Sequence, residues 1–203
     1  KVVLVDCGVK HNIIRCLINR GVEVIRVPWD YNFNELEFDG LFLANGPGDP
    51  DTCVKTVEHI RAFLANPKVR PCMGICMGNQ VLGRALGFDT YKLKYGHRGI
   101  NQPVLDRATG RIGITAHNHG FAVDAPTDHP VDTAYGRVEV SHVCLNDGVV
   151  EGLRLTRDGR LVAFSVQYHP EAAAGPHDAS YLFDEFVAMM ADNARTTTAG
   201  EQA

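Results

Sequence analysis

VRPCMGICMGNQVLGRALG, residues 69–87, decides the fold, because an apolar strand pattern passes directly into a helical one. The run 69–75 is typical of a buried strand, and 80–86 has the spacing of a short helix. Residues 74–78 between them read G-x-C-x-G, the cysteine counterpart of the nucleophile elbow. The stretch therefore predicts a strand–turn–helix unit that presents Cys76 at the N-terminus of a helix.

The rest of the first half repeats the same alternation. Apolar runs at 2–5, 22–27 and 41–44 predict buried strands, and helical spacing at 12–20 and 54–64 predicts helices. From residue 91 the pattern changes to short strands, at 91–95, 111–116, 137–144, 148–155 and 161–167, before a final amphipathic helix around Leu182 to Asp192. We therefore predict an α/β fold, with a mixed, mostly parallel central sheet, helices on both faces and a smaller antiparallel sheet.

One domain is expected over residues 1–194, followed by a polar, disordered tail at 195–203 that has no periodicity. The sequence starts with Lys1 directly on a strand pattern, so we expect an excised domain or a processed fragment. No apolar run approaches the roughly 20 residues that span a bilayer, and no signal-peptide pattern is present. We therefore expect a cytoplasmic protein.

The net charge and the spacing of the cysteines limit the kinds of partner and of structural site that the sequence predicts. The 203 residues carry a net charge of −4 without a basic block, which predicts neither a nucleic-acid nor a membrane partner. The six cysteines form no Cys-x-x-Cys pair, unlike a zinc ribbon or a disulfide framework. Most are expected to be buried small hydrophobic residues.

The turn around Cys76 has a chemical interpretation. Side chains at positions 74 and 78 would collide with the neighbouring strand and helix, which explains the two glycines. The helix N-terminus is expected to lower the pKa of the Cys76 thiol, and the N–H of Met77 to point at a developing oxyanion. The alternative is a buried cysteine whose glycines serve only tight packing, so the motif needs catalytic partners.

His169-Pro170-Glu171 follows the strand pattern 161–167, at the end of a strand where α/β sites usually form. If the chain curls at Pro170, Glu171 can orient the His169 ring for proton transfer. The order Cys, His, Glu along the chain differs from the Ser, Asp, His order of the α/β-hydrolases. Taken alone, the segment is more often a simple turn than a catalytic pair.

Gly74 to Gln80 together with His169-Pro170-Glu171 resembles the class I, triad-type glutamine amidotransferases. Five further segments resemble the glutaminase region of carbamoyl-phosphate synthetase: Asp6 to Lys10, Asn45 to Pro50, Lys94 to Val104, Asn118 to Val123 and Gly175 to Asp178. The resemblance covers nearly the whole chain. This family often has Leu, His and Gln where Met77, Asn79 and His117 stand here.

The resemblance implies a catalytic triad of Cys76, His169 and Glu171. It also implies a glutamine pocket and oxyanion site lined by Gly46, Gly48, Met77, Gln80, Asn118, Gly120 and Phe121. The implied reaction releases ammonia from L-glutamine for a large synthetase subunit or domain. No cofactor and no metal are expected in this chain, which lacks a Gly-Lys-Ser/Thr loop, and ATP and Mg²⁺ are assigned to the partner synthetase.

Three other functions remain open from the residues. A metal hydrolase would use His117 and His119, which alternate on one strand face without a nearby third ligand in the sequence. His97 is expected in a turn, solvated or hydrogen-bonded. The second open function is a non-catalytic regulatory or partner-dependent module on the same fold. The third is a cysteine peptidase that uses the same elbow.

Overall fold

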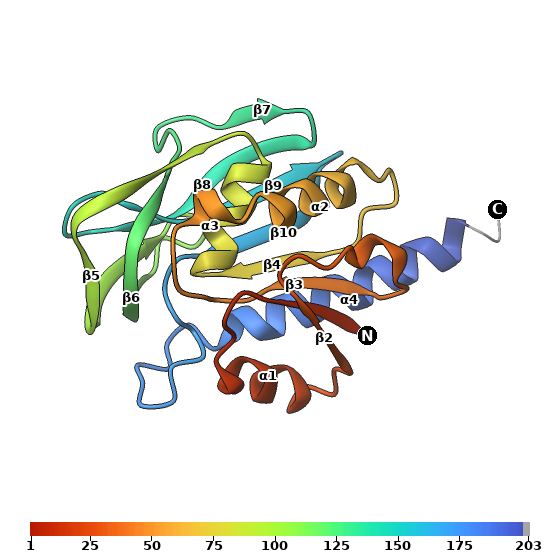
Figure 1. Ribbon diagram of the computed structural model, residues 1–203, viewed down its shortest axis with the longest axis horizontal. Helices are drawn as coiled ribbons and strands as arrows, with labels where there is room; N and C mark the ends of the chain where they lie inside the picture. Colours follow the sequence, from red (N-terminus) through yellow and green to blue (C-terminus); the bar gives the residue numbers. More distant parts are fainter. Residues whose placement is uncertain (201–203) are drawn as a thin grey trace.

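One sheet forms the centre of the computed structural model, which describes residues 1–200 and the side chains of residues 1–195 (Figure 1). Its strands are β1 (Val2–Asp6), β2 (Val24–Pro28), β3 (Gly40–Leu43), β4 (Cys72–Ile75), β5 (Asp89–Asp106), β6 (Ile112–Asp124), β7 (Val131–Thr133), β8 (Gly136–Cys144), β9 (Val150–Arg157) and β10 (Arg160–Val166). The α-helices are α1 (His11–Ile18), α2 (Val54–Ala65), α3 (Met77–Ala85) and α4 (Tyr181–Gly200), and short 3₁₀ helices span Phe33–Glu35 and Pro50–Thr52.

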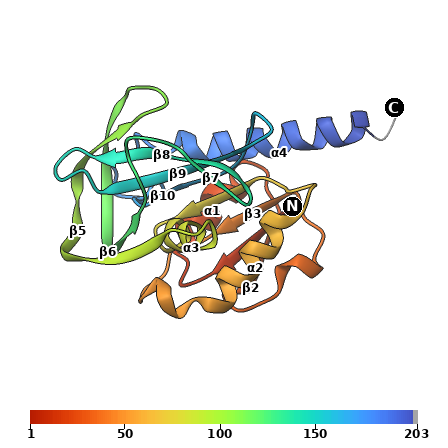
Figure 2. The same ribbon diagram turned by 90° about the horizontal axis from the view of Figure 1, so that it is seen from above.

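The strand order is β2-β1-β3-β4-β10-β9-β8-β5-β6, with β7 beside β8. Pairing is parallel from β2 to β10 and antiparallel from β10 to β6. The α/β class with a mixed sheet is confirmed, but the antiparallel strands do not form a separate smaller sheet. They continue the same sheet because β10, from the second half of the chain, pairs with β4. Figure 2 shows β5 and β6 turned across the end of the other strands.

Helices cover both faces of the parallel half, as the uninterrupted apolar strand patterns predict. Successive residues of β1 point to opposite faces: Val3 and Val5 pack in the cluster that contains the buried sides of α2 and α3. Val2 and Leu4 pack in the cluster that contains α1 and α4. Figure 1 shows α2 and α3 above β3 and β4, and α1 and α4 below them.

Helix α4 ends later than the sequence indicated. Its backbone is helical through Gly200, where we expected a disordered tail from residue 195. Phe183 and Phe186 are fully buried and anchor the helix, and each further residue adds one backbone hydrogen bond to an existing helix. The last part of the expected tail, 201–203, lies outside the described residues. Within residues 1–200, no helix is both long and apolar enough to cross a membrane.

The largest local difference concerns the β5–β6 hairpin. Both strands are longer than the predicted segments 91–95 and 111–116, and β5 contains glycines and a proline that usually interrupt strands. The pairing register shifts between Lys92 and His97 and again between Gly99 and Gln102. These irregularities accommodate the strand-breaking residues, so local propensity underestimates the hairpin.

Candidate active site

Cys76 occupies a strained turn between β4 and α3. Its backbone has φ 56° and ψ −102°, a conformation that residues other than glycine rarely adopt. The Cys76 N–H donates to the carbonyl of Val166 at 2.9 Å, and its own carbonyl accepts from the N–H groups of Asn79 and Gln80 at 3.1 and 3.2 Å. These bonds hold the turn to both β10 and the first turn of α3.

The two glycines of the turn are required by space. A Cβ at Gly74 would lie 2.7 Å from the carbonyl oxygen of Gly78, and a Cβ at Gly78 would lie 2.1 Å from that of Leu43. Both separations are far shorter than a van der Waals contact. The predicted collisions are therefore confirmed, with Leu43 of β3 as the neighbouring strand.

His169 and Glu171 meet at the end of β10. His169 Nδ1 and Glu171 Oε1 are 2.7 Å apart, and the two residues are 4% and 2% exposed. The N–H of Ala172 donates to the His169 carbonyl at 3.2 Å, so the chain curls at Pro170 as the pairing requires. A carboxylate only accepts hydrogen bonds, so Nδ1 donates to Glu171, and Nε2 is the nitrogen that can take up a proton.

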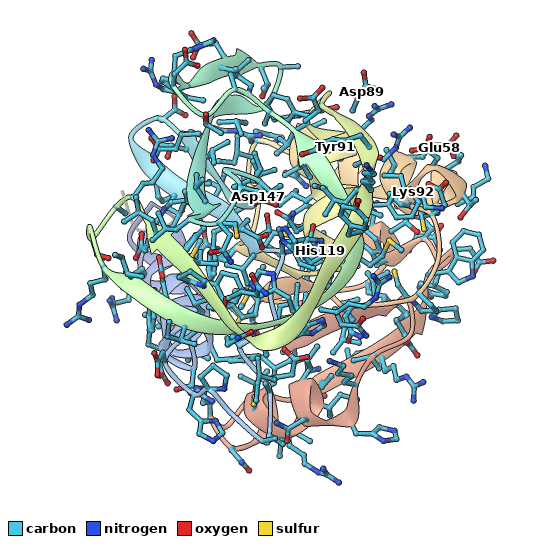
Figure 3. All side chains as sticks on the ribbon, turned by 90° about the vertical axis from the view of Figure 1, so that its left-hand side faces the viewer. Glu58, Asp89, Tyr91, Lys92, His119 and Asp147 are labelled. Carbon is cyan, nitrogen blue, oxygen red and sulfur yellow. The ribbon has the colours of Figure 1, made fainter. Side chains whose placement is uncertain are left out.

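The parallel pairing of β4 and β10 brings these motifs together. Ile75 is the register partner of Val166, so Cys76 and the segment leading to His169 leave the sheet at the same edge. Both side chains line a cavity of about 740 Å³. The cavity is lined by Gly8, Lys10, Asn45, Gly46, Pro47, Gly48, Asp49, Cys76, Gln80, Lys92, Arg98, Asn118, His119, Gly120, Phe121 and His169. Figure 3 faces the β5–β6 side of this region and labels Lys92 and His119.

Most of the predicted pocket residues lie on this cavity, and two residues of the predicted site do not. Gly46, Gly48, Gln80, Asn118, Gly120 and Phe121 all line it. The Met77 side chain is 2% exposed and packs in the core, so only its backbone faces the site. Glu171 lies behind His169, away from the cavity wall.

Comparison with known proteins agrees with this geometry. The sequence pattern of the family described as glutamine amidotransferase class-I matches residues 3–189. The chain belongs to the class-I glutamine amidotransferase family. The match covers the strand–turn–helix unit at Cys76 and the His169–Glu171 pair alike.

The chain is 59% identical to the carbamoyl phosphate synthase small chain of Streptomyces avermitilis over 192 residues, which are 93% of this chain and 49% of that protein. It is 54% identical to the small chain of Mycobacterium leprae over 193 residues, 94% of this chain and 50% of that protein. The chain thus spans about half the length of these curated relatives. Among solved structures, a Thermoplasma acidophilum protein provisionally assigned as part of a GMP synthase has a TM-score of 0.75 at 21% identity, covering 97% of this chain and 96% of that one. This last likeness shows the fold alone.

The electrostatics at Cys76 differ from the sequence expectation. Burial raises the pKa of the Cys76 thiol to about 12, while the Met77 N–H and, more weakly, Lys10 lower it. The expectation of a lowered pKa was wrong, because removing the sulfur from water outweighs the helix N-terminus. Near pH 7 the thiol is therefore neutral, and only removal of its proton by a base would make it a strong nucleophile.

A buried polar network fixes the start of α3 to β10. Gln80 Nε2 lies 3.0 Å from the Phe121 carbonyl and 3.2 Å from Gln167 Oε1, and Asn79 Nδ2 also donates to Gln167 Oε1 at 3.1 Å. Ser165 Oγ donates to Asn79 Oδ1 at 2.8 Å. Asn79, whose role the sequence left open, therefore ties α3 to the strand that leads to His169.

Sequence reasoning assigned no role to Lys10 and Asn45, which also lie on the cavity. Lys10 Nζ is 3.6 Å from Glu171 Oε1, and Asn45 Oδ1 accepts the Lys10 backbone N–H at 3.0 Å. Both belong to segments that carry the family resemblance, but their function depends on contacts between the loops after β1 and β3. No local pattern reveals such contacts.

Proposed function

We propose that this domain hydrolyses L-glutamine to glutamate and ammonia through a thioester on Cys76. The observation that carries the proposal is the 2.7 Å contact between buried His169 and Glu171, on the same cavity as a cysteine held at φ 56°. A strained nucleophile, a histidine with a free Nε2 and a carboxylate that orients the ring are the parts that acyl transfer needs.

In the first half-reaction, His169 Nε2 removes the Cys76 thiol proton as the sulfur attacks the side-chain carbonyl carbon of glutamine. The N–H groups of Met77 and of the Gly46 to Gly48 loop stabilise the oxyanion that forms. His169 then gives its proton to the leaving nitrogen, so that ammonia departs and a glutamyl thioester remains. Glu171 holds the ring and stabilises its charged form throughout.

In the second half-reaction, His169 takes a proton from a water molecule that attacks the thioester carbonyl. The C–S bond breaks, glutamate leaves, and the thiolate recovers its proton from His169. The remaining cavity residues, Gln80, Asn118, Gly120 and Phe121, hold the amino-acid end of glutamine. No bound cofactor is required in this chain for these steps.

The ammonia is used by the large subunit or domain of a carbamoyl-phosphate synthetase, where ATP and Mg²⁺ are consumed. Similarity to two carbamoyl phosphate synthase small chains over more than nine-tenths of this sequence supports this partner. The six free thiols fit the reducing cytoplasm, where such a synthetase would operate. Neither a nucleic acid nor a membrane takes part.

Two experiments test the proposal. Rapid quenching of the protein with glutamine, followed by peptide mass spectrometry, should find a glutamyl adduct on the peptide that contains Cys76. A reaction with the large subunit, amide-labelled glutamine and excess unlabelled ammonium should give carbamoyl phosphate that retains the label. An adduct on another cysteine would refute the assigned nucleophile, and full dilution of the label would refute transfer to the partner.

A further inference from the structure

Four side chains from three strands converge in the interior beside the glutamine cavity. His97 of β5, His117 and His119 of β6, and Glu151 of β9 place their ligand atoms within 4.8 Å of one another. His97 and His119 are register partners in the β5–β6 hairpin, which explains how they meet. The side chains of His117, His119 and Glu151 are at most 1% exposed, and that of His97 is 11% exposed.

The outward ring nitrogen of each histidine has a partner that accepts a hydrogen bond. His119 Nδ1 lies 2.9 Å from the Phe121 carbonyl, and His97 Nε2 lies 2.8 Å from Asp147 Oδ2. His117 Nε2 lies 2.7 Å from the Thr115 hydroxyl, whose own proton goes to the Gln102 carbonyl. In the neutral rings these partners place the proton outside and direct a lone pair into the cluster.

With the protons placed outside, the nitrogen and oxygen atoms that face the centre of the cluster repel one another. His117 Nδ1 and His119 Nε2 face each other at 3.2 Å, with lone pairs opposed when both rings are neutral. Glu151 Oε1 lies 3.0 Å from His97 Nδ1, and its buried Oε2 has no hydrogen-bond partner among the described residues. His97 lies between the carboxylates of Glu151 and Asp147, so either a proton on His97 Nδ1 or a bound cation supplies the positive charge that these carboxylates attract. Only a bound cation also relieves the opposed lone pairs of His117 and His119.

We infer that His97, His117, His119 and Glu151 bind one divalent transition-metal ion, with Zn²⁺ as the best match. Zinc–nitrogen bonds of about 2.0–2.1 Å imply ligand atoms about 3.3–3.4 Å apart around a tetrahedron. Three separations are near this value: 3.0 Å for His97 Nδ1–Glu151 Oε1, 3.2 Å for His117 Nδ1–His119 Nε2 and 3.5 Å for His119 Nε2–Glu151 Oε1. His117 Nδ1 lies 3.6 Å from the other carboxylate oxygen, Glu151 Oε2. Imidazole and carboxylate ligands suit zinc, and the three outward hydrogen bonds supply the orienting outer shell.

Four protein ligands close the coordination sphere, which is typical of a structural rather than a catalytic metal. The ion would join β5, β6 and β9. Arg98, Asn118 and Gly120, which adjoin the ligands in sequence, line the glutamine cavity, so the ion would fix that wall. The inference does not rest on glutamine hydrolysis. It departs from the sequence expectation that no metal is present. The expectation that His97 lies in a turn was wrong, because His97 belongs to β5.

Metal content gives the first test. The protein is purified without a histidine tag from zinc-supplemented cells, dialysed, and measured by inductively coupled plasma mass spectrometry. We expect about one zinc per chain in the wild type and in His129→Gln, which changes an exposed histidine. His117→Gln and Glu151→Gln should retain almost none. Wild-type protein that neither carries zinc nor binds added zinc chloride would overturn the inference, as would unchanged zinc in both variants.

Affinity and geometry give the second test, which remains informative if a variant is poorly folded. Asp147 contacts His97 from outside the cluster, so Asp147→Asn should weaken zinc binding about 10- to 100-fold without abolishing it. Figure 3 labels Asp147 and His119 on the side of the molecule that faces the viewer. Cobalt-loaded wild type should show the intense visible bands of a tetrahedral ion. The weak octahedral spectrum of aqueous cobalt would show that the cluster binds no ion, and so would a Tm that zinc does not change. Either result would overturn the inference and indicate that a protonated histidine neutralises Glu151.

Discussion

Substitution of Gly78 by alanine tests the physical account of the nucleophile turn. The added Cβ would lie 2.1 Å from the Leu43 carbonyl oxygen and 2.9 Å from the Leu43 Cβ. To restore an ordinary contact of 3.4 Å, β3 and the start of α3 must separate by 1.3 Å. Neither is free to move, because Leu43 is fully buried and the α3 end is bonded to Cys76 and β10.

The expected cost follows from this overlap. Overpacking of this kind destabilises by about 1–3 kcal/mol. At about 2–4 °C per kcal/mol for a chain of this size, the Tm should fall by roughly 2–12 °C. Displacement of the nucleophile by about 1 Å should also lower kcat/KM for glutamine by about 100-fold.

The assay combines thermal denaturation with glutamate release, measured with the large subunit present. Gly113→Ala is the matched control, because its Cβ would meet only the Thr115 methyl at 3.9 Å. The control should leave both Tm and activity unchanged. If Gly78→Ala equals Gly113→Ala in both measurements, the steric explanation of the glycine is refuted.

Three further predictions concern the site and the core. Glu171→Gln should lower kcat for glutamate release by about 10²- to 10⁴-fold with little change in Tm, because His169 loses its charged partner. A near-normal kcat would contradict the role of Glu171 in orienting the His169 ring. The rate at which iodoacetamide alkylates Cys76, followed by peptide mass spectrometry without glutamine, should rise about tenfold per pH unit from pH 7 to 10. The reason is that the pKa of Cys76 is raised to about 12, so the thiolate fraction grows tenfold with each pH unit. A rate that is already constant near pH 7 would show that the thiolate is formed there. Phe186→Ala should lower the free energy of unfolding in urea by about 3–5 kcal/mol, because this fully buried ring packs edge-on against Phe42. A loss below about 1 kcal/mol would show that Phe186 does not anchor α4.

The sequence predicted the elements whose apolar pattern is continuous or helical. The strand at Val2, the helix from Val54 and the strand before Cys76 all appear close to their expected positions. The long β5 was underestimated because its glycines and Pro103 are tolerated only through register shifts with β6. The single continuous sheet was missed because the β4–β10 pairing joins segments about 90 residues apart, which no local pattern encodes.

The candidate site shows the same limit. The sequence singled out Cys76, His169 and Glu171 because each lies in a short motif. The structure places Cys76 and His169 on one cavity and Glu171 against His169. The raised pKa of Cys76 could not be foreseen, since burial depends on the whole fold. The histidine cluster was set aside for lack of a third ligand, and only the β5–β6 register and β9 bring His97 and Glu151 to it.

The most direct test of the account is glutamate release from glutamine by the purified protein, measured alone and with a carbamoyl-phosphate synthetase large subunit. Cys76→Ala removes the proposed nucleophile. Cys72→Ala, which removes another buried thiol from β4, the strand just before Cys76, is the control. We predict that wild type and Cys72→Ala release glutamate in the presence of the large subunit, while Cys76→Ala stays at background. Substantial release by Cys76→Ala, or background release by wild type in both conditions, would contradict it.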